Sequence, residues 1–243
     1  VDATVELSLE PGWHDVWMSV AGGLSVRGRI FVVADDQELG IVCDVDDTIM
    51  VTALPRPLLA AWNSFVRDEH ARRPVPGMAV LLERMVRQHP GSPVIYLSTG
   101  AWNVQPTIIR FLKRHLYPMG SLLLTDWGPT ADRFFRSGRQ HKKDSLERLA
   151  RDFPTIKWIL IGDDGQHDEE LYGSFAMNHP DQVRAIAIRE LLAPEALLAG
   201  GRSHRDRTAN PDTTPWVSAP NGAGLAVELA KLGVLEWPDH SPE

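Results

Sequence analysis

An acidic segment directly after an apolar run is the first feature of this sequence that could do chemistry. The run covers 40–43 (GIVC), and the acidic segment covers 44–48 (DVDDT). A carboxylate in the position of Asp44 can attack phosphorus and form an aspartyl-phosphate. A second carboxyl group two residues later, that of Asp46, can protonate the leaving oxygen and then activate water. The segment therefore favours phosphoryl transfer, although alone it is also typical of a solvated loop.

Further polar side chains follow the other apolar runs. An open α/β sheet binds its ligands at the carboxyl ends of its strands. Carboxylates that converge there cannot all stay ionised without a neutralising partner, and Mg²⁺ suits a few carboxylates combined with phosphate oxygens. Lys142 adds a cation for the charge on a transferring phosphoryl group, and hydroxyl groups can also bind it. The polar residues after these runs are Ser98, Thr99, Asp126, Asp163, Asp164 and Asp168.

Short apolar runs alternate with amphipathic stretches from residue 39 onward. Most of the runs are apolar on both faces, as buried parallel strands must be. They cover 40–43, 93–97, 122–124, 158–161 and 183–188. Apolar residues at helical spacing predict helices at 77–88, 104–115, 143–153 and 223–232, with a further strand at 216–218. Alternating strands and helices predict an α/β fold, a three-layer αβα sandwich with a Rossmann-like parallel sheet.

The first forty residues have a different pattern. Period-two alternation at 4–9 and an apolar run at 29–33 indicate strands, with Gly and Pro turns between them. We expect an N-terminal β segment at 1–38, either the remnant of a small β domain or a hairpin packed on the main body. A catalytic domain is expected at 39–236, followed by a frayed tail at 237–243.

Composition limits the function further. The 243 residues carry a formal net charge of −7, which argues against a general nucleic-acid binder. Cys43 is the single cysteine, so an internal disulfide is excluded and a reducing compartment is favoured. No apolar run is long enough to span a membrane. We expect a cytoplasmic protein, peripheral to a membrane; the first residue, Val1, indicates a processed chain or a piece of a longer one.

Four segments together resemble the motifs of haloacid dehalogenase superfamily phosphatases. Segment 41–48 resembles the first motif, DxDx[T/V] after a hydrophobic strand, and Ser98 resembles the second. Lys142 resembles the third, and the pair Asp163 and Asp168 the fourth. All four occur in order at suitable spacing.

A narrower resemblance covers about residues 40–190, with further likeness at 215–235. The segments that carry it resemble the actin-patch-associated phosphatidate phosphatases and their bacterial relatives, which are related to the lipins. These segments are YLS at 96–98 followed by Trp102, HK at 141–142, DFP at 152–154 and GDDGQHD at 162–168.

The resemblance implies catalytic roles. Asp44 is implied to be the nucleophile, Asp46 the general acid and base, and Thr48 the residue that orients Asp46. Ser98 and Lys142 are implied to bind the phosphoryl group. Two alternatives stay open: Thr99 could bind the phosphoryl group instead of Ser98, and Lys143 could bind it instead of Lys142.

The resemblance also implies a Mg²⁺ site. Asp44, the main-chain carbonyl of Asp46 and Asp163 are the implied ligands. Asp168 is implied to support the metal without contacting it. Asp164 stands where a small hydroxyl residue is usual in these relatives, so either Asp164 or Asp168 completes the site.

The spacing of the motifs limits the kind of substrate. About 50 residues separate Thr48 from Ser98, which leaves no room for a large cap domain. A site without a lid excludes water poorly from a small metabolite, but it accepts a phosphate that projects from a lipid surface, a protein or a polymer. Basic residues around Phe134 and Phe135 at 131–151, in a part that reads as a turn, indicate either a membrane-resting wedge or an ordinary helix face.

The expected function is a Mg²⁺-dependent phosphomonoesterase that converts phosphatidate to diacylglycerol through an aspartyl-phosphate. Its partner is a phosphorylated substrate at a membrane surface, and no nucleic acid is expected. Two alternatives remain: a phosphatase for a soluble, protein or polymer phosphate, and a non-catalytic binding module of the same fold. Intact Asp44 and Asp46 argue against the binding module.

Overall fold

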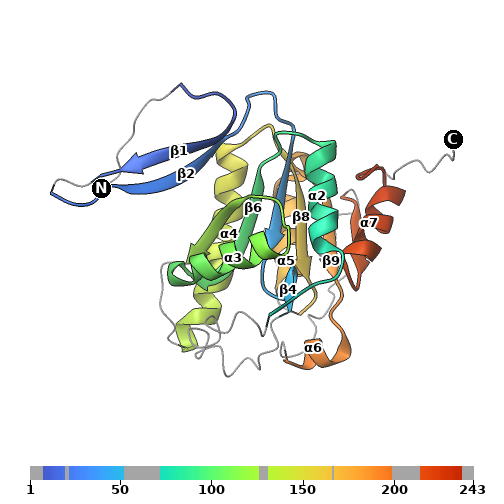
Figure 1. Ribbon diagram of the computed structural model, residues 1–243. Helices are drawn as coiled ribbons and strands as arrows, with labels where there is room; N and C mark the ends of the chain where they lie inside the picture. The colour runs from blue at the N-terminus through green and yellow to red at the C-terminus, as the bar shows by residue number, and fades with distance from the viewer. Residues whose placement is uncertain are drawn as a thin grey trace.

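A six-stranded parallel sheet forms the centre of the molecule (Figure 1). The computed structural model describes residues 8–19, 22–51, 72–125, 131–165, 167–198 and 214–236, without the side chains of 131–137 and 198. The strands lie in the order β10-β9-β8-β3-β6-β7. Their bounds are β3 Leu39–Asp44, β6 Val94–Ala101, β7 Ser121–Thr125, β8 Lys157–Asp163, β9 Val183–Arg189 and β10 Trp216–Ala219.

Helices cover both faces of this sheet (Figure 1). One face carries α2 Met78–Gln88, α3 Gln105–Arg114 and α7 Gly222–Lys231. The other face carries α4 Ala131–Asp152 and α5 Asp168–Asn178. The short helix α6 Ala193–Leu198 lies beyond the carboxyl ends of the strands. The predicted three-layer αβα sandwich with a Rossmann-like parallel sheet is therefore confirmed.

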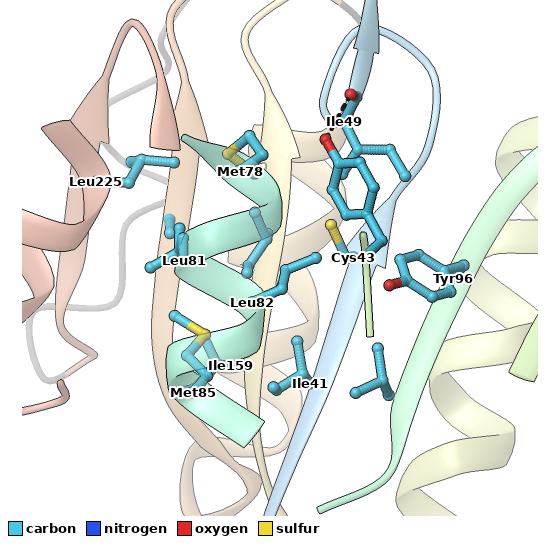
Figure 2. Close-up of a cluster of buried hydrophobic side chains, with 14 of the residues drawn as sticks. Ile41, Cys43, Ile49, Met78, Leu81, Leu82, Met85, Tyr96, Ile159 and Leu225 are labelled. Atoms are coloured by element: carbon cyan, nitrogen blue, oxygen red, sulfur yellow. Dashed lines mark hydrogen bonds between the residues drawn. The ribbon is translucent and has the colours of Figure 1, made fainter. Parts of the chain in front are cut away.

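Alternating side chains of the strands build the two apolar layers. Ile41 and Ile159 face α2, where Leu81, Leu82 and Met85 cover them (Figure 2). All five side chains are at most 1 % exposed. Burial of each such side chain stabilises the fold by about 1.5–3 kcal/mol. The sequence predicts helix α2 because its apolar residues recur at helical spacing on one face, while its polar residues face solvent.

The opposite layer packs against α4 and α5. Val42 and Leu160, the neighbours of the residues described above, point to this side and contact the cluster that includes Leu146 and Tyr172. Trp158 is fully buried in the same layer. Since residues adjacent in a strand face opposite sides of the sheet, the all-apolar runs of the sequence serve both layers.

Three helical segments differ from the prediction, and one of them, the short helix α6, lies where no helix was expected. The expected helix at 143–153 begins at Ala131, so the part of the chain that read as a turn is helical, and the side chains of Phe134 and Phe135 lie outside the described residues. Helix α5 was not predicted. Its buried residues include Leu171, Tyr172 and Phe175, but its apolar and polar residues are not separated on two faces, so helical periodicity does not reveal it.

The N-terminal segment forms a hairpin that projects from the main body (Figure 1). Strands β1 Gly12–Met18 and β2 Val26–Val32 pair antiparallel. The guanidinium of Arg29 lies 5.2 Å from the ring centroid of Trp13 and also donates to the sulfur of Met119 on the main body, at 2.9 Å. Most of the strand expected at 4–9 lies outside the described residues, and positions 8 and 9 are not in a strand.

A second small pair follows β3. Strands β4 Met50–Val51 and β5 Arg73–Pro74 pair antiparallel. Residues 52–71 between them lie outside the description, as does the predicted tail at 237–243. Two single-turn 3₁₀ helices, Trp102–Val104 and Pro180–Gln182, complete the described elements. Among the helices that the structure describes, none has the length and apolar character required to cross a bilayer.

Candidate active site

The order of the strands places the carboxyl ends of β3, β6 and β8 side by side. From β3 the chain moves outward through β6 to β7, then returns to β8 on the other side of β3. The carboxyl end of β3 therefore lies at a switch point, where α/β sheets open a crevice for ligands. Asp44 is in register with Leu97, the residue before Ser98, and Cys43 is in register with Ile161, two residues before Asp163.

A tight turn follows Asp44, the last residue of β3. Asp47 has a φ of 58°, in the left-handed region that Asp tolerates better than most residues. Its amide donates to the carbonyl of Met50 at 2.9 Å, and the carbonyl of Ile49 accepts from the hydroxyl of Tyr117 at 2.9 Å (Figure 2). These contacts fix the turn that carries Asp46 and Thr48.

Lys142 extends from α4 into the centre of this site. Its Nζ lies 2.6 Å from Oδ1 of Asp44 and donates to Oδ1 of Asp168, also at 2.6 Å. Burial lowers the pKa of Lys142, but the carboxylates of Asp168 and Asp44 outweigh this effect and raise it above its usual value. The ammonium therefore stays charged at neutral pH.

Three buried carboxylates meet around this ammonium. Asp44, Asp163 and Asp168 each offer an oxygen, and these oxygens all lie within 4.8 Å of one another. Burial raises the pKa of Asp44 and of Asp163 well above the usual value; Asp168 adds to the effect at both, and Lys142 opposes it. One ammonium cannot balance three buried carboxylates, so the group favours an additional cation.

Two carboxylate oxygens of the site have no partner among the described residues. They are Oδ2 of Asp44 and Oδ1 of Asp46, both buried. A buried polar atom without a hydrogen bond is costly, because it loses its contacts with water. The oxygen-only donor set and these two orphaned atoms fit a hard divalent cation such as Mg²⁺.

Asp164 and Asp168, the two candidates for completing the site, lie in different surroundings. Asp168 belongs to the cluster described above. Oδ1 of Asp164 instead accepts from the amide of Leu191 at 2.8 Å, and its own amide donates to the carbonyl of Arg189 at 3.0 Å. Asp164 thus fixes the chain after β9, and Asp168 contacts Lys142.

Asp46 and Ser98 form the other half of the site. Oγ of Ser98 donates to Oδ2 of Asp46 at 3.1 Å and accepts from the amide of Gly100 at 3.0 Å. Burial raises the pKa of Asp46, while the positive charge of Arg72 opposes the shift. A carboxyl group whose pKa is raised is better suited to carry a proton near neutral pH.

Thr48 and Thr99 lie in different surroundings. The hydroxyl of Thr48, expected to orient Asp46, donates to Oδ2 of Asp163 at 3.4 Å. The Thr99 side chain is partly exposed, whereas Ser98 is fully buried against Asp46. Asp126, after β7, lies outside the described residues.

A glycine allows the Asp168 carboxylate to approach the sheet. Gly162 is the residue before Asp163 in β8. A Cβ at this position would lie 2.6 Å from Oδ2 of Asp168 and 2.7 Å from Cε2 of Tyr172. Contacts that short require the neighbours to shift, so Gly162 is part of the geometry that brings Asp168 to Lys142.

Two arginines beside the site were not identified from the sequence. Arg189 ends β9, and its guanidinium donates to the carbonyl of Asp47 at 2.5 Å. Its position in the sequence could have identified Arg189, because it directly follows the apolar run 183–188 and the other site residues also follow such runs. Arg72, whose charge acts on Asp46, does not follow an apolar run, so no comparable pattern marks it in the sequence.

Comparison with known proteins matches the part of the chain that carries this site. The family described as "Phosphatidate phosphatase APP1, catalytic domain" matches residues 39–190. "Phosphatidate phosphatase APP1" of Saccharomyces cerevisiae is 27% identical over 156 residues, 62% of this chain and 26% of that protein. An uncharacterized protein of Schizosaccharomyces pombe, C29B5.04c, is 25% identical over 170 residues, 66% of this chain and 26% of the relative.

The chain spans about a quarter of the length of these curated relatives. The matched region includes β3, β6, β8 and β9 and all the residues of the acidic cluster. The match covers more than half of the chain, and the chain therefore belongs to the family of phosphatidate phosphatase APP1 catalytic domains.

Proposed function

We propose that this chain is a Mg²⁺-dependent phosphomonoesterase that uses Asp44 as its nucleophile and phosphatidate as its substrate. The observation that carries the proposal is the buried Oδ2 of Asp44, which has no hydrogen-bond partner among the described residues while Lys142 holds the other oxygen of the same carboxylate. An oxygen held this way is pre-oriented for attack. The name of the yeast relative, phosphatidate phosphatase APP1, supports the choice of phosphatidate.

In the first step, an oxygen of Asp44 attacks phosphorus and the bond from phosphorus to the leaving oxygen breaks. Asp46 gives its proton to that leaving oxygen, which departs as the hydroxyl of diacylglycerol. Lys142 and Ser98 bind the phosphoryl oxygens, on which negative charge is concentrated. The product of this step is an aspartyl-phosphate on Asp44.

In the second step, water attacks the phosphorus of the aspartyl-phosphate. Asp46, now ionised, accepts a proton from this water as the acyl-phosphate bond breaks. Inorganic phosphate leaves and the carboxylate of Asp44 is restored. The raised pKa of Asp46 suits this exchange, because the group must both give and accept a proton.

Asp44, Asp163 and the main-chain carbonyl of Asp46 are the groups that would hold Mg²⁺. The ion would neutralise phosphate charge and orient the substrate for in-line attack. Asp168 binds Lys142 and thereby positions the ammonium beside Asp44. Thr48 donates to Asp163 and holds that carboxylate in place.

A lipid substrate requires the carboxyl edge of the sheet to face a membrane surface. We therefore expect a protein that acts peripherally at the cytoplasmic face of a bilayer. Helix α6 lies on this side of the molecule (Figure 1). Leu192, just before α6, and Leu197 within it are exposed. Their exposed fractions are 57% and 80%, which suits contact with an apolar surface.

A substrate panel tests the proposal. Phosphate release is measured from phosphatidate in mixed detergent micelles, a phosphopeptide, a sugar phosphate and a polyphosphate, each with Mg²⁺ and with EDTA. We expect the highest kcat/KM with phosphatidate and loss of activity in EDTA that Mg²⁺ restores. A higher kcat/KM with a soluble phosphate would make the protein a phosphatase of another substrate class. No release from any compound would favour a binding module.

A further inference from the structure

A buried arginine outside the acidic cluster contacts the turn that carries the site. Arg189, at the carboxyl end of β9, has a side chain that is 3% exposed. Its Nη1 donates to the carbonyl of Asp47 at 2.5 Å, and its Nη2 donates to Oε2 of Glu195 in α6 at 2.6 Å. Its Nε also donates to the carbonyl of Pro220, the residue after β10, at 3.4 Å. From the end of β9, one guanidinium thus contacts three further segments of the chain: the turn after β3, helix α6 and the residue after β10.

The contact with Asp47 is made where the turn is conformationally demanding. Asp47 has a positive φ and lies directly after Asp46, the proposed acid and base. A hydrogen bond to its carbonyl fixes the orientation of the peptide group between Asp47 and Thr48. A guanidinium is suited to this task, because its planar fork can donate in two directions at once from one rigid group.

The segment after β9 holds Arg189 in place from its other side. Oε2 of Glu195 also accepts from the amide of Leu192 at 3.0 Å. The carbonyl of Arg189 accepts from the amide of Asp164, whose side chain in turn accepts from the amide of Leu191. Arg189 is therefore held both by Glu195 after β9 and by the amide of Asp164 after β8, and from this position its guanidinium contacts the turn after β3.

A buried ion pair could also serve stability alone. Such pairs contribute little on average, because the cost of removing both charges from water offsets their attraction. The pair of Arg189 and Glu195 alone would not require a contact with the catalytic turn. The short hydrogen bond to Asp47 is the feature that a purely structural pair does not explain.

We infer that Arg189 is a positioning residue for the reaction: held by Glu195, it fixes the carbonyl of Asp47 and thereby the geometry of the turn that follows Asp44 and carries Asp46. This inference rests on the proposed function. Its structural part states only that Arg189 keeps the turn after β3 in a fixed conformation. A misplacement of about 1 Å in a reacting group can cost on the order of a hundredfold in rate.

Two variants test the inference. Arg189→Lys keeps the charge but loses the fork that reaches both partners. The double variant Arg189→Met/Glu195→Gln removes both charges together, so no unbalanced charge remains buried if the single variant does not fold. Arg184→Lys is the matched control, because Arg184 lies on the same strand and its guanidinium bonds the distant carbonyl of Gly233.

Three quantities are measured for each protein: the melting temperature, kcat and KM for p-nitrophenyl phosphate with Mg²⁺, and amide hydrogen exchange. We expect either test variant that folds to lose about tenfold to a hundredfold in kcat with KM within about twofold of wild type. Exchange should become faster at residues 44–50 and stay unchanged in the other strands. Arg184→Lys should match the wild type in all three.

The inference is overturned if both folded variants keep the wild-type kcat and the wild-type exchange at 44–50. It is also overturned if exchange accelerates equally throughout the sheet, since Arg189 would then act on global stability. If the wild type hydrolyses no phosphate ester, the proposed function fails, and exchange alone decides the role of Arg189. Acceleration confined to 44–50 then supports it, and unchanged exchange contradicts it.

Discussion

The Nζ of Lys142 lies 2.6 Å from Oδ1 of Asp44, and both side chains are almost completely buried. The ammonium therefore stands next to the proposed nucleophile before any substrate is bound. In this position it can balance the charge of the carboxylate and later that of the phosphoryl oxygens. A charge in this place should therefore matter for turnover, and it also offsets part of the repulsion among the three buried carboxylates.

Replacement of Lys142 tests this relationship. We expect Lys142→Met to reduce kcat for p-nitrophenyl phosphate by about 10²–10³, since one charged donor to the transition state is lost. Initial rates over a range of substrate concentrations measure the effect. Lys143→Met is the control: Lys143 is exposed and adjacent in sequence, so its replacement should leave the rate near that of wild type. Equal losses in the two variants would contradict the assignment.

The two aspartates that follow Asp163 should differ in their effect on activity. Asp168→Asn weakens the contact with Lys142 and alters the acidic cluster, so we expect a loss of about a hundredfold or more in kcat and a higher Mg²⁺ requirement. Asp164→Asn affects a contact to the amide of Leu191, and we expect a much smaller loss without a change in the Mg²⁺ requirement. Titration of activity with Mg²⁺ measures both; the reverse order would make Asp164 the residue of the metal site.

Removal of a buried charge should stabilise the metal-free protein. The pKa of Asp163 is raised in the folded state by burial first and by Asp168 next, so the folded state binds this proton more tightly than the unfolded state. Its contribution to stability is therefore present at low pH and is lost as the pH rises through the raised pKa. In EDTA at about pH 7.5, Asp163→Asn should melt above wild type, by about 2–4 °C for each kcal/mol gained.

The difference in melting temperature should shrink as the pH is lowered, because the wild-type carboxyl group then becomes protonated. Added Mg²⁺ should raise the melting temperature of the wild type more than that of Asp163→Asn. Thermal melts at several pH values measure the effect, with Asp144→Asn as the control, since Asp144 is an exposed carboxylate on α4. A variant that is less stable than wild type in EDTA at neutral pH would disagree with this account of the site.

Gly162 should be sensitive to the addition of a single methyl group. In Gly162→Ala, the new Cβ would displace the carboxylate of Asp168, and we expect a loss of about tenfold or more in kcat with a destabilisation of about 1–3 kcal/mol. Gly40→Ala is a suitable comparison, because its Cβ would lie 2.4 Å from the Trp158 ring at the start of β3. Gly40→Ala should be less stable than wild type, but its kcat should equal that of wild type when it is assayed well below its melting temperature. Retained activity in Gly162→Ala would show that Asp168 needs no such close approach.

The sequence was sufficient to predict which strand ends meet. Parallel strands buried on both faces appear as continuous apolar runs, and the residue after each run falls at one edge of the sheet. The positions of Asp44, Ser98 and Asp163 follow from this rule. The rule says nothing about side-chain direction, so it could not separate Asp164 from Asp168 or find that Thr48 donates to Asp163.

Other features depend on contacts between distant segments. Helix α5 is buried by tertiary packing and lacks the one-sided apolar pattern that reveals α2. The bond from Arg189 to Asp47 joins residues 142 positions apart, and only the strand order β9-β8-β3 brings them close. The positive φ of Asp47 is likewise set by its surroundings, because an Asp in a turn is compatible with several conformations.

The most direct test of the account is the role of Asp44 itself. Initial rates of p-nitrophenyl phosphate hydrolysis with Mg²⁺ are compared for wild type, Asp44→Asn and the exposed control Asp144→Asn. We predict that wild type and Asp144→Asn turn over at similar rates, and that Asp44→Asn is slower by more than about a thousandfold while it remains folded. Wild-type activity in folded Asp44→Asn would contradict the claim that this carboxylate attacks phosphorus.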